Sequence, residues 1–335
     1  TDSGTLAITG TTTLVTSANE ATIALDDTSN AFTGALTITT NDDSGADADV
    51  TIDGGTTALV IAESIIDGDL TLIGGHASGI TDSGTVTVGG NLSATTDANN
   101  GDIDMGTLAV TGTIALTTND SAGDNTGHAT VVNASAIEFA TSSVDGNLIA
   151  TATAGNMTDS GILTVTGTSL FTTSASGADI NLDSSNLFTG AVTLAPTGSG
   201  DATITTGSVA LNIAASEVGG NLTVSAAENV TQSGALDIGG TTTVTMTASK
   251  EVSLNNTSND FTGAVSITNG TKMRLTDSNA LEIGTIEGTW ATITAGGHVT
   301  QSADGTFDTS NFFSVSAVGY DVTLTNPGST ATRIK

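Results

Sequence analysis

The sequence predicts an all-β fold: a right-handed parallel β-helix (β-solenoid) that continues from residue 1 to residue 335. Three observations predict it, namely an internal repeat, strands with one apolar face, and a lack of two-residue turns between mirrored strands. Tandem β-sandwich domains with the same repeat length are the alternative.

The composition excludes several classes of function. Of 335 residues, 35 are acidic and 5 are basic, which gives a formal net charge of -30 and argues against binding to nucleic acid. No apolar stretch reaches the roughly 18 residues of a transmembrane segment. The chain has no Cys, so disulfides and thiolate metal sites are excluded.

A recurring tetrapeptide divides the chain into similar sequence units. Each copy begins with Thr and a polar residue, and its last position is a glycine turn marker in the first four copies: Gly4, Gly84, Gly161 and Gly234. The predicted units are 1–80, 81–157, 158–230 and 231–299, with a partial fifth unit or cap at 300–335. Such internal repetition is typical of repeat architectures.

Two further markers recur inside the units. The phrase Phe-Thr-Gly-Ala begins at Phe32, Phe188 and Phe261, and we expect these rings at equivalent corners of the core. The phrase Gly-Asp/Asn-Leu begins at Gly68, Gly146 and Gly220. Both phrases contain the small and polar residues that mark turns.

Between the markers, apolar residues alternate with Thr or Ser, as in residues 35–39, 221–225 and 241–246. This period of two predicts short half-buried strands, and no segment has the spacing of an amphipathic helix. With about 20 residues per coil and about 4.8 Å between strands, about sixteen coils are predicted. Aromatic residues make up only 3% of the chain, so the expected core consists of Leu, Val and Ile.

The repeated phrases resemble those of filamentous-haemagglutinin-like exoproteins and related giant β-strand-repeat surface proteins of bacteria. The likeness lies in residues 219–226, 229–236 and 259–265, and it extends through nearly the whole chain. The resemblance implies a parallel β-helix, export to the cell surface, and a role as fibre, adhesin or matrix.

Acidic residues are the candidate metal ligands. Asp47, Asp49 and Asp53 lie along one predicted strand and turn, and Asp102 and Asp104 alternate along another. Alternate residues share a face, and Ca²⁺ binds several oxygen ligands. A solvated acidic loop is the alternative interpretation of both sets. The three histidines have no metal-binding spacing, and no catalytic residue is predicted.

The last residues depart from the repeat, with Phe312, Phe313 and Tyr320 as candidate contacts between chain ends. We expect self-association into a homopolymer, or contact with neighbouring segments of a longer chain. The predicted function is a non-catalytic extracellular fibre, stalk or adhesin shaft. The alternative is an S-layer-like or glycan-binding surface module that Ca²⁺ stabilises, with surface glycans as partners.

Overall fold

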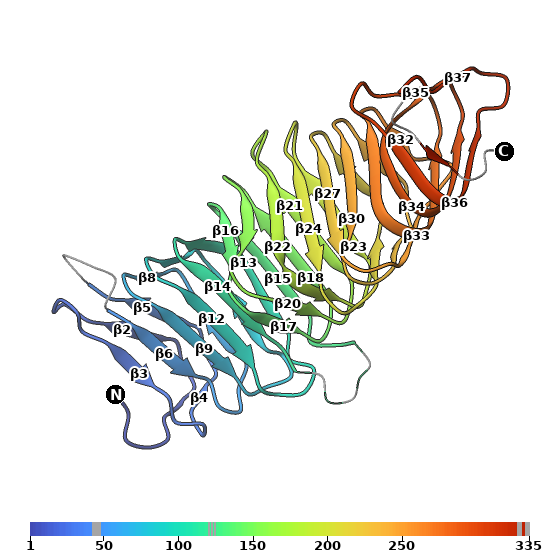
Figure 1. The fold of residues 1–335 in the computed structure, drawn as a ribbon. Helices are drawn as coiled ribbons and strands as arrows, with labels where there is room; N and C mark the ends of the chain where they lie inside the picture. The colour runs from blue at the N-terminus through green and yellow to red at the C-terminus, as the bar shows by residue number, and fades with distance from the viewer. Residues whose placement is uncertain (42–47, 120, 122, 124, 327–329, 332–335) are drawn as a thin grey trace. The chain divides into compact units, whose positions relative to one another are not determined.

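The computed structural model describes residues 1–41, 48–119, 121, 123, 125–326 and 330–331 (Figure 1). The described residues form strands and turns and contain no helix, so none that could cross a membrane. The chain divides into two compact units, which we call the N-terminal unit (Thr1–Ser169) and the C-terminal unit (Leu170–Lys335).

The N-terminal unit consists of short strands. They are β1 (Ala7–Ile8), β2 (Thr12–Val15), β3 (Ile23–Leu25), β4 (Ala31–Phe32), β5 (Leu36–Thr39), β6 (Val50–Asp53), β7 (Leu59–Ile61), β8 (Ser64–Ile66), β9 (Leu70–Gly74), β10 (Ile80–Asp82), β11 (Val86–Val88), β12 (Leu92–Thr96), β13 (Ile103–Val110), β14 (Thr113–Thr117), β15 (Ala129–Asn133), β16 (Ile137–Phe139), β17 (Ser142–Val144), β18 (Leu148–Ala152), β19 (Met157–Asp159) and β20 (Leu163–Val165).

The C-terminal unit continues with strands of the same kind, of which β21 begins one residue before the boundary. They are β21 (Ser169–Thr173), β22 (Ile180–Phe188), β23 (Val192–Pro196), β24 (Ala202–Thr206), β25 (Leu211–Ile213), β26 (Ser216–Val218), β27 (Leu222–Ala226), β28 (Val230–Gln232), β29 (Leu236–Ile238), β30 (Thr242–Met246), β31 (Glu251–Leu254), β32 (Asp260–Phe261), β33 (Val265–Asp277), β34 (Leu281–Ala295), β35 (Val299–Gln301), β36 (Phe307–Ser316), β37 (Val322–Thr323) and β38 (Thr330–Ala331).

Strands of successive coils pair in parallel. In the N-terminal unit β9, β12 and β14 pair in succession, with Leu70 opposite Leu92 and Leu92 opposite Ile114. In the C-terminal unit β24, β27 and β30 do the same. The predicted parallel β-solenoid is confirmed, with about 14 turns instead of sixteen, and the sandwich alternative is wrong.

The alternating pattern places one face of most strands in a narrow apolar core. Ile204, Val224, Val244 and Ile267 follow one another through four coils of the C-terminal unit, and each is fully buried. The intervening Thr and Ser residues point outward. Burial of each aliphatic side chain contributes about 1.5–3 kcal/mol, so stability accumulates coil by coil from small side chains.

A typical coil has one side formed by a five-residue strand and another formed by two three-residue strands with a corner between them. The long strand β27 and the short pair β28 and β29 provide an example. At intervals the two kinds of side exchange: the long strand β5 pairs with the short strands β7 and β8 of the next coil. Strand β14 pairs in the same manner with β16 and β17.

A buried serine supplies the missing acceptor where a long strand pairs with two short strands of the next coil. The corner between two short strands leaves one N–H of the long strand without a backbone acceptor, and a serine Oγ takes that place. Ser64 Oγ accepts from Ile38 N–H at 2.9 Å, Ser142 Oγ from Leu116 N–H at 3.1 Å, and Ser216 Oγ from Leu194 N–H at 3.0 Å. Each hydroxyl also donates to the carbonyl oxygen two residues earlier: Ala62, Ala140 and Ala214. The motif Ala-x-Ser is therefore a fourth repeated marker, which the sequence analysis missed.

We predict that Ser216→Ala lowers the free energy of unfolding by about 1–3 kcal/mol, because it leaves the buried Leu194 N–H without an acceptor. Chemical denaturation of the purified chain measures this. The matched control is Ser225→Ala, which changes an outward-facing serine of β27 and should cost less than about 0.5 kcal/mol. Equal losses in the two variants would contradict the assigned role of Ser216.

Candidate functional site

The residues that recur in the sequence meet at the corners of the coils. At one corner of the N-terminal unit, side-chain oxygens of one coil accept backbone N–H groups of the next. Asp49 Oδ1 accepts from Asp69 N–H at 2.8 Å, Asp69 Oδ1 from Asn91 N–H at 2.6 Å, and Asn91 Oδ1 from Thr113 N–H at 2.9 Å. We call such a series a corner ladder.

Two more corner ladders have the same construction. In the second, Asp102, His128 and Asn147 accept in turn from the N–H groups of His128, Asn147 and Thr168, at 2.7, 2.9 and 2.8 Å. The third lies in the C-terminal unit. There Asp179, Asp201 and Asn221 accept from the N–H groups of Asp201, Asn221 and Thr241, at 2.8, 2.6 and 2.8 Å.

At several corners the residue before the donor N–H is a glycine, which leaves room for the acceptor of the preceding coil. A Cβ on Gly68 would collide with Asp49 Oδ1, and one on Gly220 would collide with Asp201 Oδ1. Gly146 has the same relation to Nδ1 of His128. In the marker Gly-Asp/Asn-Leu, the glycine therefore leaves space for the acceptor of the preceding coil. The Asp or Asn is the hydrogen-bond acceptor for the next coil, and the Leu belongs to the core.

The first and fourth tetrapeptides pair with a buried asparagine of the following coil. Asn30 donates from Nδ2 to Asp2 Oδ2 at 2.8 Å, and its Oδ1 accepts from Leu6 N–H at 2.8 Å. This bond from Asn30 lowers the pKa of Asp2. In the C-terminal unit Gln232 replaces the aspartate, and it exchanges two side-chain hydrogen bonds with Asn259 at 2.7 and 3.0 Å.

The last residue of the tetrapeptide packs directly on the Ala-x-Ser corner. A Cβ on Gly84 would meet Glu63 N, and those on Gly161 and Gly234 would collide with the backbone of Thr141 and Ala215. A Cβ on Gly4 would meet nothing within 4 Å. The rings of the third marker, Phe32, Phe188 and Phe261, are fully buried.

The aspartates that the sequence analysis assigned to Ca²⁺ lie in different environments. Asp47 falls outside the described residues. Asp49 is exposed in a corner ladder, whereas Asp53 is only 4% exposed and accepts from Gly55 N–H at 2.7 Å. Asp102 and Asp104 both face outward, as the alternation predicted. No group of three His, Asp or Glu in the described part of the chain comes close enough to hold a metal ion.

Burial changes the acidity of two aspartates. Loss of solvent raises the pKa of Asp53. The same cause raises the pKa of Asp277 to about 6, because this carboxyl is 2% exposed. Asp277 Oδ1 accepts from Phe261 N–H at 3.4 Å, and Oδ2 is buried without a hydrogen bond.

The three histidines act as hydrogen-bond acceptors at turns and corners. Nδ1 of His76, His128 and His298 accepts from the N–H of Ser78, Asn147 and Asp321. These contacts give each histidine a local structural role.

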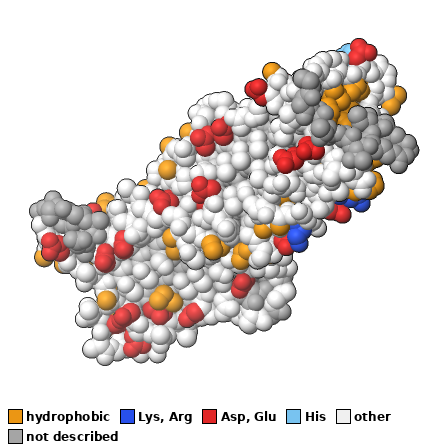
Figure 2. All heavy atoms as spheres, viewed as in Figure 1, with side chains coloured by type: hydrophobic (Ala, Val, Ile, Leu, Met, Phe, Trp, Pro, Cys, Tyr) orange, Lys and Arg blue, Asp and Glu red, His pale blue; other side chains and the backbone are white. Residues whose placement is uncertain are grey.

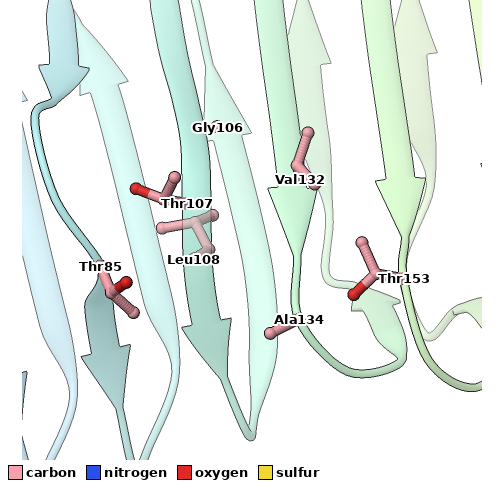
Figure 3. A pocket seen from close by; sticks show the side chains of 7 residues that line it. All are labelled: Thr85, Gly106, Thr107, Leu108, Val132, Ala134 and Thr153. Atoms are coloured by element: carbon pink, nitrogen blue, oxygen red, sulfur yellow. The ribbon is translucent and has the colours of Figure 1, made fainter.

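Two hollows on the described surface bear on a possible site. The hollow in Figure 3 has a volume of about 230 Å³ and lies where the pairing of β13 with β15 shifts register. Its lining residues are Thr85, Gly106, Thr107, Leu108, Val132, Ala134 and Thr153. None of them has a side chain that titrates near neutral pH, so this hollow offers no general acid or base.

A second hollow, of about 220 Å³ in the C-terminal unit, includes the carboxylates of Glu287 and Asp308, which face each other on successive coils. Both side chains are exposed. Acidic side chains are scattered over the face in Figure 2, whereas basic side chains appear only toward the C-terminal end. The described basic residues are Lys250, Lys272 and Arg274.

The three residues that the sequence analysis proposed as contacts between chain ends differ in exposure. Phe313 is fully buried and stacks on Phe307, with ring centroids 4.7 Å apart, so it belongs to the core and is not available for such a contact. Alternation along β36 turns Phe312 outward instead. Tyr320 is 50% exposed and packs edge-on against His298.

Comparison with known families identifies a repeat family without an assigned activity. The family model described as "Repeats of unknown function (DUF5649)" matches residues 1–39, 47–105, 126–195, 199–268 and 270–334. The chain therefore belongs to this family. No curated protein and no solved structure matches the chain.

We predict that Gly220→Ala lowers the free energy of unfolding by about 2–3 kcal/mol, because the new Cβ displaces Asp201 Oδ1 from the ladder. The control is Gly106→Ala, where a Cβ would meet nothing within 4 Å and the change should stay within about 0.5 kcal/mol. Urea denaturation of both variants tests this. A Gly220→Ala protein as stable as the parent would show that the ladder tolerates a side chain there.

We predict that Asp277→Asn raises stability at pH 7 by about 1–3 kcal/mol. The folded carboxyl binds its proton more tightly than the unfolded one, so its contribution to stability is present below pH 4. That contribution is lost as the pH rises through about 6. Stability measured from pH 4 to 8 should fall less with pH in Asp277→Asn than in the parent. If the stability of the two proteins changed with pH in parallel, the raised pKa of Asp277 would be contradicted.

Proposed function

We propose that the chain is a non-catalytic extracellular structural protein: a β-solenoid stalk, fibre or adhesin shaft whose copies associate end to end. The proposal rests on one observation: the repeated residues form contacts between neighbouring coils. In both units, the tetrapeptides, Ala-x-Ser corners and corner ladders all connect one coil to the next. In an enzyme, by contrast, the functional residues gather at a single site.

Two further observations support a role without chemistry. The hollow in Figure 3 has no acid or base, and the described residues offer no group for a metal ion. The extracellular location rests on the composition and on the resemblance to filamentous-haemagglutinin-like exoproteins. No Cys and few basic residues are typical of such surface proteins.

The experiment is to lengthen the chain by one sequence unit. A variant with a second copy of residues 158–230 inserted after residue 230 adds three to four coils, which should lengthen the particle by about 15–20 Å. Electron microscopy and small-angle X-ray scattering of both proteins measure this. An added unit that leaves the longest dimension unchanged would contradict a shaft.

The same images test end-to-end association. Filaments, or particles at multiples of the single length, support it, and monodisperse single particles at high concentration contradict it. Addition of a chelator distinguishes the Ca²⁺-stabilised alternative, because loss of a bound ion lowers the melting temperature. A shaft without Ca²⁺ should melt at the same temperature with and without chelator.

A further inference from the structure

One column of side chains in the C-terminal unit departs from the Thr and Ser surface. Parallel pairing of β31, β33, β34 and β36 places Glu251, Lys272, Trp290 and Phe312 opposite one another on four successive coils. Arg274 lies two residues along the strand from Lys272 and opposite Thr292. The only Trp of the chain and two of its five basic residues are therefore neighbours.

The aromatic part of this column is a platform of one exposed ring, Trp290, and one half-buried ring, Phe312. Trp290 is 44% exposed, and its ring lies 5.4 Å from that of Phe312 at an angle of 37°. The faces of aromatic rings carry partial negative charge and attract weakly positive C–H groups. A pyranose ring presents such C–H groups on one face and hydroxyls around its edge, so it fits a platform with polar surroundings.

The charges beside the platform select the kind of sugar. Lys250 forms an ion pair with Glu228 at 2.7 Å, and Arg274 forms one with Glu251 at 3.5 Å. Lys272 is exposed and has no ion pair among the described residues. It lies one coil, about 4.8 Å, from Trp290. A ring stacked on Trp290 would hold a carboxylate at its edge within reach of the Lys272 ammonium group.

We propose that this column binds an acidic saccharide, namely a uronic acid unit of an anionic polysaccharide. The sugar ring stacks on Trp290 and Phe312, and its carboxylate pairs with Lys272. Arg274 and the hydroxyl of Thr292 lie next to the Lys272 side of the platform and are the nearest donors for ring hydroxyls. This binding activity goes beyond the structural role proposed above.

The acidic surroundings fix the orientation of the sugar. Glu287 and Asp308 precede Trp290 and Phe312 at the neighbouring corner, so a carboxylate is repelled from that side and favoured on the side of Lys272. The net charge of -30 opposes an anionic ligand at long range. Salt screens this repulsion over about 8 Å at physiological ionic strength. The charges in contact with the sugar therefore determine whether its carboxylate binds. We therefore expect weak binding per sugar, with Kd of about 0.1–1 mM.

Trp290 provides the signal for the test, because it is the only Trp of the chain. The probe is tri-galacturonic acid, titrated into the full chain while tryptophan emission is recorded, with galactotriose as its neutral counterpart. We expect a saturable change with the acidic trisaccharide and at least fivefold weaker binding of the neutral one. Lys272→Ala should weaken binding of the acidic trisaccharide at least fivefold, and Lys272→Arg should retain it within twofold.

The matched control is Lys250→Ala, which removes a basic residue whose charge Glu228 already neutralises, and it should leave the affinity unchanged. All three substitutions change surface side chains, and thermal melts confirm that each protein is folded. Three results would overturn the proposal: no saturable change up to about 20 mM trisaccharide, equal binding of the neutral sugar, or equal losses in Lys250→Ala and Lys272→Ala.

Discussion

The structure depends on one constraint: a chain that turns a corner every few residues must still find an acceptor for each corner N–H group. The N–H groups of strands pair with backbone carbonyls of the neighbouring coil. The N–H groups at corners lie outside this backbone pairing. An unpaired N–H costs about 1–3 kcal/mol where it is buried, as it would be where a long strand meets two short ones, and less at the exposed corners, where water can reach it. The corner ladders of Asp, Asn and His, and the buried Ser64, Ser142 and Ser216, supply the missing acceptors.

This constraint explains the unusual composition. Small hydrogen-bonding side chains are needed at the corners, and glycine is needed where the acceptor of one coil approaches the backbone of the next. Outward strand positions require only a residue that suits a pleated surface, and Thr does. Leu, Val and Ile fill most of the narrow core, and the aromatic residues buried with them are Phe32, Phe139, Phe171, Phe188, Phe261, Phe307 and Phe313. Because the ladder and the core act between neighbouring coils, stability is expected to be local and additive, as in other repeat proteins.

The fold could be predicted from the sequence because its signals are periodic. The alternation in residues 221–225 and the tetrapeptide repeat depend on local geometry, and the structure has the parallel coils that they predict. The exchange of long and short sides could not be predicted in this way. It depends on which strands meet across coils, and the sequence contains only a modest sign of it, the spacing of Ala-x-Ser at 62–64, 140–142 and 214–216. Alternation along β36 alone would have separated the buried Phe313 from the outward Phe312. The pairing of Lys272 with Trp290 depends on the register between coils, which no local pattern specifies.

Amide hydrogen exchange at the ladder positions tests the central claim most directly. The N–H groups of Asn91, Asn147 and Asn221 lie at exposed or half-buried corners, where amides without a hydrogen bond exchange rapidly. If side chains of the preceding coil hold them, these amides should be protected to nearly the same degree as strand amides such as those of Ala94 and Val224. Exchange at the rate of unprotected loop amides would contradict the account.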